Sequence, residues 1–222
     1  MLRVTEVYGA EASHPGIGFL SENSQFAHEC LAQGLNFIGP SPESMEAMGD
    51  KSKAIHTSIE LGVPVVPGSH GLLRNITHAE QVADEIGFPI ILKAAHGGGG
   101  RGMRVVHEES DLEGALEQAQ RESLAAFGSP DIFVEKFIEH ARHIEVQLLG
   151  DRHGSLVHLF ERDCSVQRRH QKVVEIAPAP LLDPTVKQSL CDAAIAIGRE
   201  VQYSAAGTVE FLVDADTNNF YF

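Results

Sequence analysis

Lys93-Ala-Ala-His-Gly-Gly-Gly-Gly-Arg-Gly-Met103 is the stretch that decides the fold, because it places a run of glycines between two β-rich segments. Glycine has no Cβ, so a glycine backbone can bring its N–H groups close to an anion. The stretch differs from a P-loop, since the lysine precedes the glycines and a strand follows them. It predicts a two-strand flap over phosphates, and the alternative is a surface hairpin with a permissive loop.

Short strands and helices around the glycine run predict a small α+β lid over residues 65–137, in the order β–α–β–loop–β–α–β. Thr77 is expected to cap a helix that ends at Ile86, with Glu80 completing a capping box. The other expected elements are three strands and one helix, at 89–94, 103–106, 132–135 and 111–126.

The residues before the lid have the pattern of the end of an α/β unit. A helix is predicted at 24–33 and a strand at 35–38. A further helix is expected to start at Ser41 and to continue through Asp50 to Leu61.

The residues after the lid predict a mostly antiparallel sheet, since apolar and polar residues alternate from Ile144 to Leu148. We further expect a strand at 156–160 and a helix at 185–201. A closing hairpin is expected from strands at 208–213 and 220–222. The chain ends on Phe-Tyr-Phe, an apolar edge that folded domains seldom leave unprotected, so we expect a truncated domain.

Glu161-Arg-Asp-Cys-Ser-Val-Gln-Arg-Arg-His-Gln-Lys172 concentrates hydrogen-bond donors between two β-rich runs. Donors held in fixed geometry suit carboxylate, bicarbonate or phosphate oxygens. The alternative is a solvated run of charges.

Two further places could carry chemistry. Glu135 and Lys136 end a strand and lead into Ile138, a position suited to an adenine ring but also to an ordinary hinge. Glu210 is expected on the sheet face opposite Val209 and its apolar neighbours, where a carboxylate could hold Mg²⁺. Lys51 by itself is a solvated helical lysine.

Composition excludes several classes of protein. The chain carries 17 basic and 31 acidic side chains, and this negative charge argues against nucleic-acid binding. It has no membrane-spanning apolar run and no histidine spacing typical of zinc sites. Three widely spaced cysteines favour a reducing, intracellular compartment.

Taken together, these segments resemble the biotin carboxylase family of the ATP-grasp superfamily. The matching segments occur in the family's order from His14 to Phe222 and are HPGIGFLSEN, IGPSPE, MGDKSKA, GVPVVPGS, KAAHGGGGRGMRVV, FVEKFIE, RHIEVQ, ERDCSVQRRHQKVVE, APAP and AGTVEFL. The resemblance implies a mixed α/β and α+β chain, with a partial ATP-grasp fold after the end of an N-terminal doubly wound α/β domain. It divides the chain into that domain end, linking helices, the lid subdomain and the first part of the C-terminal subdomain, at 1–47, 48–64, 65–137 and 138–222.

The resemblance also implies roles in ATP binding. Lys51 and Lys93 would contact the phosphates, with Lys93 also near the adenine side. Gly99 and Gly100 would lie in the flap that closes over the phosphates. Glu135, Lys136 and Ile138 would line the adenine pocket. His143, Gln167 and His170 would contact the ribose.

Glu210 would be a ligand of Mg²⁺ or Mn²⁺, and Lys172 would help to bind bicarbonate. In the implied reaction, bicarbonate attacks the γ-phosphate of ATP to give carboxyphosphate and ADP, and the carbon is then transferred to biotin. The implied partners are bicarbonate, biotin on a carrier domain, a carboxyltransferase domain or subunit, and further copies in a homo-oligomer. Neither nucleic acid nor a membrane is expected.

Two features depart from the family pattern. Ile17 stands where the family usually has an aromatic residue near the biotin site. The Glu-x-Asn-x-Arg segment that the family places just after the final strand is absent, so we expect little carboxylase activity from this chain alone.

The carboxyl acceptor stays open between pyruvate, which the segment Val174-Glu-Ile-Ala-Pro-Ala favours, and an acyl-CoA. Other readings are a carbamoyl-phosphate type of ATP-grasp ligase, which lacks the QRRHQK segment, and a non-catalytic fragment that binds nucleotide. The expected compartment is the cytoplasm or the mitochondrial matrix.

Overall fold

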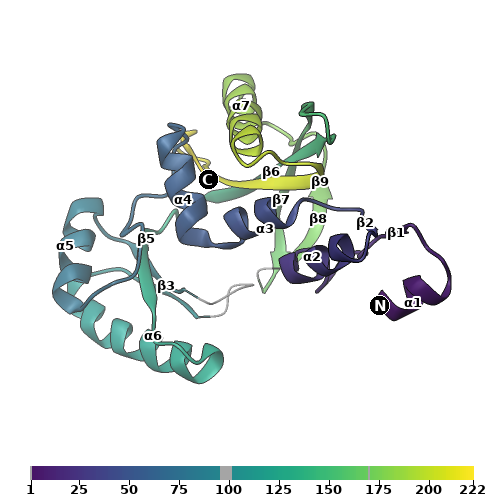
Figure 1. Cartoon of the computed structure of the whole chain (residues 1–222). Coiled ribbons are helices and arrows are strands. Elements are labelled where there is room, and N and C mark those ends of the chain that lie inside the picture. The colour runs from purple at the N-terminus through teal and green to yellow at the C-terminus, as the bar shows by residue number, and fades with distance from the viewer. Residues whose placement is uncertain (1, 96–101, 170) are drawn as a thin grey trace.

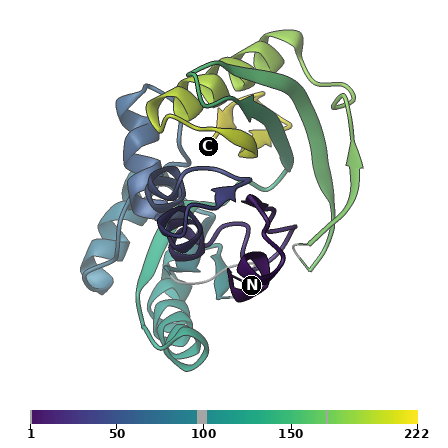
Figure 2. The same cartoon turned by 45° about the vertical axis from the view of Figure 1, so that its right-hand side comes forward.

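The computed structural model describes residues 2–95, 102–169 and 171–222. The chain forms a three-stranded sheet and a five-stranded sheet. Figure 1 shows the first sheet with helices α5 and α6 on one side of the molecule and the second sheet with helix α7 on the other. Figure 2, turned by 45°, shows the same separation. Gly99, Gly100 and His170 lie outside the described residues.

The N-terminal part contains two short helices and two parallel strands. They are α1 (Leu2–Val7), β1 (Ala12–Ser13), α2 (Ser24–Ala32) and β2 (Asn36–Phe37). Asn23 caps α2, because its side chain accepts a hydrogen bond of 2.7 Å from Phe26 N. Phe26 also packs edge-to-face on Phe37, with ring centroids 6.0 Å apart, so the predicted helix and strand share one small core.

Two helices follow where one continuous helix was expected. α3 (Pro42–Gly49) and α4 (Lys51–Glu60) are separated at Asp50, which has extended backbone angles. The Asp50 carboxylate accepts from Ser52 N and Lys53 N and thereby caps the second helix. The prediction of a continuous helix was wrong. An aspartate just before a helix can accept hydrogen bonds from the unpaired backbone amides of its first turn, which it cannot do from a position within the helix.

The lid contains α5 (Ile76–Ile86), α6 (Leu112–Phe127) and an antiparallel sheet in the order β4-β3-β5. Its strands are β3 (Ile90–Ala94), β4 (Met103–Val106) and β5 (Ile132–Lys136), and a 3₁₀ turn precedes α6 at Glu109–Asp111. The apolar side chains of both helices and the sheet form one core. The α+β lid and the strands expected at 89–94, 103–106 and 132–135 are therefore confirmed.

Two details of the lid prediction were wrong. The cap of α5 is Asn75, whose side chain accepts from His78 N at 2.9 Å, so Thr77 lies inside the helix and Glu80 completes no capping box. The strand expected at the start of the lid is reduced to a single bridge between Gly68 and Glu135. A Cβ on Gly68 would lie 2.3 Å from the carbonyl oxygen of Val134, so only glycine allows this close approach.

The second sheet is antiparallel in the order β10-β9-β6-β7-β8. Its strands are β6 (Ala141–Gly150), β7 (Leu156–Arg168), β8 (Gln171–Ile176), β9 (Ala205–Asp214) and β10 (Phe220–Tyr221). Helix α7 (Pro184–Glu200), capped by Asp183, buries its apolar side against one face of the sheet. The alternation expected around Ile144 and Phe211 is confirmed, since both side chains are fully buried in this core.

Most of the described residues of the donor-rich segment from Glu161 to Lys172 lie on strands, and Arg169 lies between the two strands. β7 continues to Arg168, far beyond the strand expected at 156–160, and β8 begins at Gln171. Charged residues can occupy these strands because one sheet face is covered by α7 while the other meets solvent and polar side chains. The predicted domain limits at 47, 64 and 137 stay predictions.

Among the described residues, no helix combines the length and apolar character needed to cross a membrane.

Candidate active site

A charged group lies on the sheet face opposite α7. Glu145 on β6 stands directly across from Glu210 on β9 and from Arg162 on β7, because the register pairs these positions. Paired residues on neighbouring strands share a face, so the three side chains meet there. Lys172 joins them from β8, next to β7.

Lys172 lies between two carboxylates. Its Nζ donates to Glu145 Oε2 and, at 2.5 Å, to Glu210 Oε1. Burial acts to lower the pKa of Lys172, but the hydrogen bonds to both glutamates outweigh it and raise that pKa. Lys172 is therefore held as a cation on the exposed side of the sheet.

Glu145 is buried, with 2% of its surface exposed, and is compensated from two sides. Besides Lys172, Arg162 donates to Glu145 Oε1 through Nε at 2.7 Å and through Nη2. Burial acts to raise the pKa of Glu145, and the hydrogen bonds from Lys172 and Arg162 outweigh it, so the pKa is lowered. Arg162 is fixed in turn by Gln147, whose Oε1 accepts at 3.0 Å.

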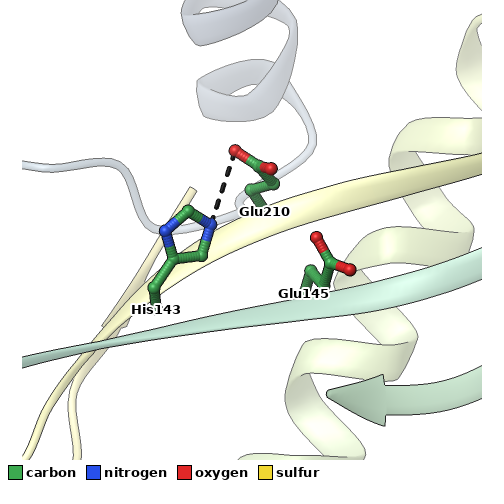
Figure 3. Close-up of side chains that lie close together, drawn as sticks. All are labelled: His143, Glu145 and Glu210. Atoms are coloured by element: carbon green, nitrogen blue, oxygen red, sulfur yellow. Dashed lines mark ion pairs between the residues drawn. The ribbon is translucent and has the colours of Figure 1, made fainter. Parts of the chain in front are cut away.

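His143 and Glu210 face one another across β6 and β9, with Glu145 beside them (Figure 3). His143 Nε2 lies 3.5 Å from Glu210 Oε2, although within the described part of the chain this nitrogen has no hydrogen bond of good geometry. Gln167 Nε2 lies 2.9 Å from His143 Nδ1. Because an amide nitrogen can only donate, Nδ1 accepts, and the neutral ring carries its proton on Nε2, towards Glu210.

The same surroundings determine the protonation of Glu210. The His143 ring and then Lys172 lower the pKa of Glu210 to about 2, against the opposing effect of partial burial. The carboxylate is therefore ionised under all but strongly acidic conditions.

A divalent cation fits the two carboxylates of this group, whereas His143, with its proton on Nε2 and Nδ1 accepting from Gln167, offers it no free lone pair. Ligand atoms of His143, Glu145 and Glu210 all lie within 4.8 Å of one another. Two carboxylates suit Mg²⁺ or Mn²⁺, which take oxygen ligands and keep positions for water and phosphate. The geometry thus supports Glu210 as a cation ligand, as predicted, and adds Glu145 as a neighbour that the sequence-based assignment did not include.

Lys93 and Glu135 form a second charged pair, on the lid. They lie at diagonal positions of β3 and β5 and are joined by an ion pair. Partial burial and then the charge of Lys93 lower the pKa of Lys51. A pKa lowered by a like charge shows that the two lysines share one neighbourhood, which favours an anion there.

Two of the residues predicted to line the adenine pocket, Lys136 and Ile138, contact or lie beside the lid itself. The Lys136 ammonium donates to the carbonyls of Gly87 and Phe88 at 3.0 and 2.9 Å, where helix α5 ends. Ile138 is half-buried just after β5. A cleft of about 580 Å³ lies elsewhere, between the segment 37–42 and the end of α7, and contains none of the predicted site residues.

The structure therefore brings the predicted residues together in two groups. His143, Gln167, Lys172 and Glu210 lie on the large sheet, whereas Lys51, Lys93 and Glu135 lie at the lid. Their roles in catalysis stay predictions. The sequence-based site assignment did not include Arg162, although it lies inside the donor-rich segment. It did not include Glu145 either, whose signal in the sequence was an acidic residue between two buried apolar neighbours.

Acid is expected to destabilise the chain. A carboxyl whose pKa is lowered on folding contributes stability that is complete above its unfolded pKa and is lost as the pH falls towards the folded value. For Glu210 this window lies between 4.5 and about 2, and Glu145 shifts in the same direction. Urea unfolding at a series of pH values should show a midpoint that falls as the pH falls through this window, and the fall should be smaller in Glu210→Gln. A midpoint that stays constant across the window would contradict the ion-pair network.

A small α+β lid beside a large antiparallel sheet that bears Lys172 and Glu210 defines an ATP-grasp protein. Residues 50–222 match the family model "Carbamoyl-phosphate synthase L chain, ATP binding domain", and residues 1–45 match "Biotin carboxylase, N-terminal domain". The chain belongs to this ATP-binding family and, with its N-terminal match, to the biotin carboxylases.

Relatives and solved structures agree with this membership. Pyruvate carboxylase of Staphylococcus aureus is 50% identical over the whole chain, which covers 19% of that relative. The mitochondrial methylcrotonoyl-CoA carboxylase subunit alpha of Dictyostelium discoideum is also 50% identical, with 32% of its length covered. The biotin carboxylase domain of Hydrogenobacter thermophilus 2-oxoglutarate carboxylase, in complex with MgADP, ADP and bicarbonate, is 46% identical with a TM-score of 0.89, and the chain covers 49% of it. The chain thus spans about a fifth of the curated pyruvate carboxylase.

Proposed function

We propose that this chain binds ATP and bicarbonate for the carboxylation of biotin on a carrier domain, within a pyruvate carboxylase. The observation that carries the proposal is the Lys172 ammonium, held between Glu145 and Glu210 beside the His143–Gln167 pair. A fixed cation near a divalent-cation site can orient a small anion such as bicarbonate towards a phosphate. The bicarbonate named for the Hydrogenobacter relative supports this choice of anion.

Each group of residues has a part in the proposed reaction. Lys51 and Lys93 neutralise ATP phosphates from the lid side, and Lys172 holds the bicarbonate that attacks the γ-phosphate. A magnesium ion on Glu210 would supply neutralisation of the charge that develops on the transferred phosphoryl group. Closure of the lid excludes the water that would hydrolyse carboxyphosphate.

Pyruvate is the proposed acceptor because pyruvate carboxylases are prominent among the relatives at about half identity. An acyl-CoA acceptor is the alternative, supported by the Dictyostelium relative. A second candidate from another class is a nucleotide-binding fragment without turnover. It shares the lid and its lysines but makes no use of Lys172.

The remaining parts of the proposal concern partners and location. We propose biotin carrier and carboxyltransferase domains as partners, within a homo-oligomer and without nucleic acid or membrane. A reducing compartment, cytoplasm or mitochondrial matrix, is supported by three buried free cysteines. Burial raises the pKa of Cys164 and Cys191 to about 11, which favours their persistence as thiols.

Calorimetry with MgATP tests the nucleotide site. We expect the chain to release heat of binding, and Lys93→Ala to weaken the affinity about tenfold or more, since a charged contact to phosphate is lost. Lys187→Ala is the matched control, because Lys187 pairs with Glu161 on the α7 side of the sheet. Equal affinity for the chain and Lys93→Ala would contradict the assignment of Lys93. Bicarbonate-dependent ATP cleavage in an intact carboxylase then separates the enzyme from the nucleotide-binding fragment.

A further inference from the structure

Glu210 already has a positively charged partner where a divalent cation would bind. Lys172 Nζ lies 2.5 Å from Glu210 Oε1, and His143 Nε2 lies 3.5 Å from Oε2. One oxygen of the carboxylate thus accepts from the Lys172 ammonium, and the other lies near the His143 ring. Lys172 also contacts Glu145, the second carboxylate of the group.

The carboxylates that hold Lys172 are the same two that could coordinate the cation. The ligand atoms of His143, Glu145 and Glu210 lie within 4.8 Å of one another, and the Lys172 ammonium contacts both carboxylates. Mg²⁺ binds oxygens at about 2.0–2.1 Å with strict octahedral geometry, which leaves little room for an ammonium on the same atom. Two positive charges sharing one carboxylate oxygen also repel one another strongly at such short range.

We propose that the Lys172 ammonium occupies the place of the divalent cation on Glu210, so that cation binding and the Lys172–Glu210 ion pair exclude one another. This inference rests on the proposed function, since it concerns the control of the same site. Lysine is suited to the task, because its ammonium is a compact charge on a flexible stem.

Glu145 keeps the displaced lysine at the site. Glu145 is almost fully buried and holds Lys172 through a different oxygen from the one that Arg162 contacts. When a cation takes Glu210, Lys172 loses one partner and keeps the other. Its released N–H donor then becomes available to an anion, so arrival of the cation prepares the lysine for bicarbonate.

Cation binding without nucleotide tests the exclusion. Mn²⁺ affinity is measured by electron paramagnetic resonance on the chain, on Lys172→Met and on the control Lys187→Met. We expect Lys172→Met to bind Mn²⁺ about tenfold or more tightly than the chain, since a competing charge is removed, and Lys187→Met to bind as the chain does. Equal affinities for the chain and Lys172→Met, or no Mn²⁺ binding by either, would overturn the inference.

A second measurement needs no variant. Amine-specific labelling followed by peptide mass spectrometry should modify Lys172 faster when Mn²⁺ is present, whereas Lys187 labels at one rate throughout. A Lys172 rate that Mn²⁺ leaves unchanged or slows would overturn the exclusion. If the chain fails to bind MgATP but Lys172→Met still gains Mn²⁺ affinity, the proposed function alone is refuted. If the chain binds MgATP but Lys172→Met gains no Mn²⁺ affinity, this inference alone is refuted.

Discussion

Glu145→Leu is expected to lower the free energy of unfolding by about 3–5 kcal/mol, the cost of removing one partner from a buried ion pair. Glu145 is 2% exposed and receives hydrogen bonds from both Arg162 and Lys172. Leucine would leave two cations on the sheet without their shared counter-charge. Lys172 would retain the carboxylate of Glu210, and Arg162 would retain only the longer contact of 3.6 Å to Glu175. Urea unfolding of the chain and of the variant measures the difference.

A double-mutant cycle separates charge from packing. Glu145→Leu combined with Arg162→Leu removes the negative charge and one of its cations together, so the double variant should be less destabilised than the sum of the two single variants. Glu145→Gln keeps the volume and a hydrogen-bond acceptor and serves as the milder control. Additive effects of Glu145→Leu and Arg162→Leu would mean that the two side chains do not act as a pair.

Lys172→Gln in an intact carboxylase that contains this chain is expected to reduce bicarbonate-dependent ATP cleavage about 10²–10³-fold, the usual loss for one electrostatic contact at a reacting group. Glutamine retains a donor but not the positive charge that Glu145 and Glu210 hold in place. Steady-state rates at varied bicarbonate concentrations measure the effect on kcat/KM.

Two comparisons make this result specific. Lys187→Gln changes the same residue type on the α7 side of the sheet, where Lys187 pairs with Glu161, and should keep the parental rate. MgATP affinity should change little in Lys172→Gln, because Lys172 is assigned to the anion and not to the nucleotide. A Lys172→Gln enzyme with parental bicarbonate kinetics would remove Lys172 from the mechanism.

Much of the fold could be predicted from local sequence signals. Period-two alternation placed the strands around Ile144 and Phe211, and the β-rich runs on either side of the glycines predicted β3 and β4. Errors arose where polar side chains decided between alternatives. Asp50 divided one expected helix into two. Asn75 capped α5 ahead of Thr77, because both Asn75 and Thr77 are residue types that cap helices and only the packed structure selects one of them.

The candidate site was predictable as a set of residues but not as an arrangement. Lys172 and Glu210 were assigned through the family resemblance, yet nothing in their spacing indicated that they contact each other. Arg162 and Glu145 were not assigned at all, although their pairing explains how a carboxylate remains ionised in a buried position.

Sequence by itself determined the membership of the family, the identity of the lid, the alternation of the strands and the residue types available for phosphate and bicarbonate. Tertiary structure alone decided which charges meet. Lys172 is 27 residues from Glu145 and 38 from Glu210, and only the register of β6, β7, β8 and β9 brings the three together. The physical reason is that alternation is a local property of one strand, whereas the neighbour across a sheet depends on turns, bulges and packing far away along the chain.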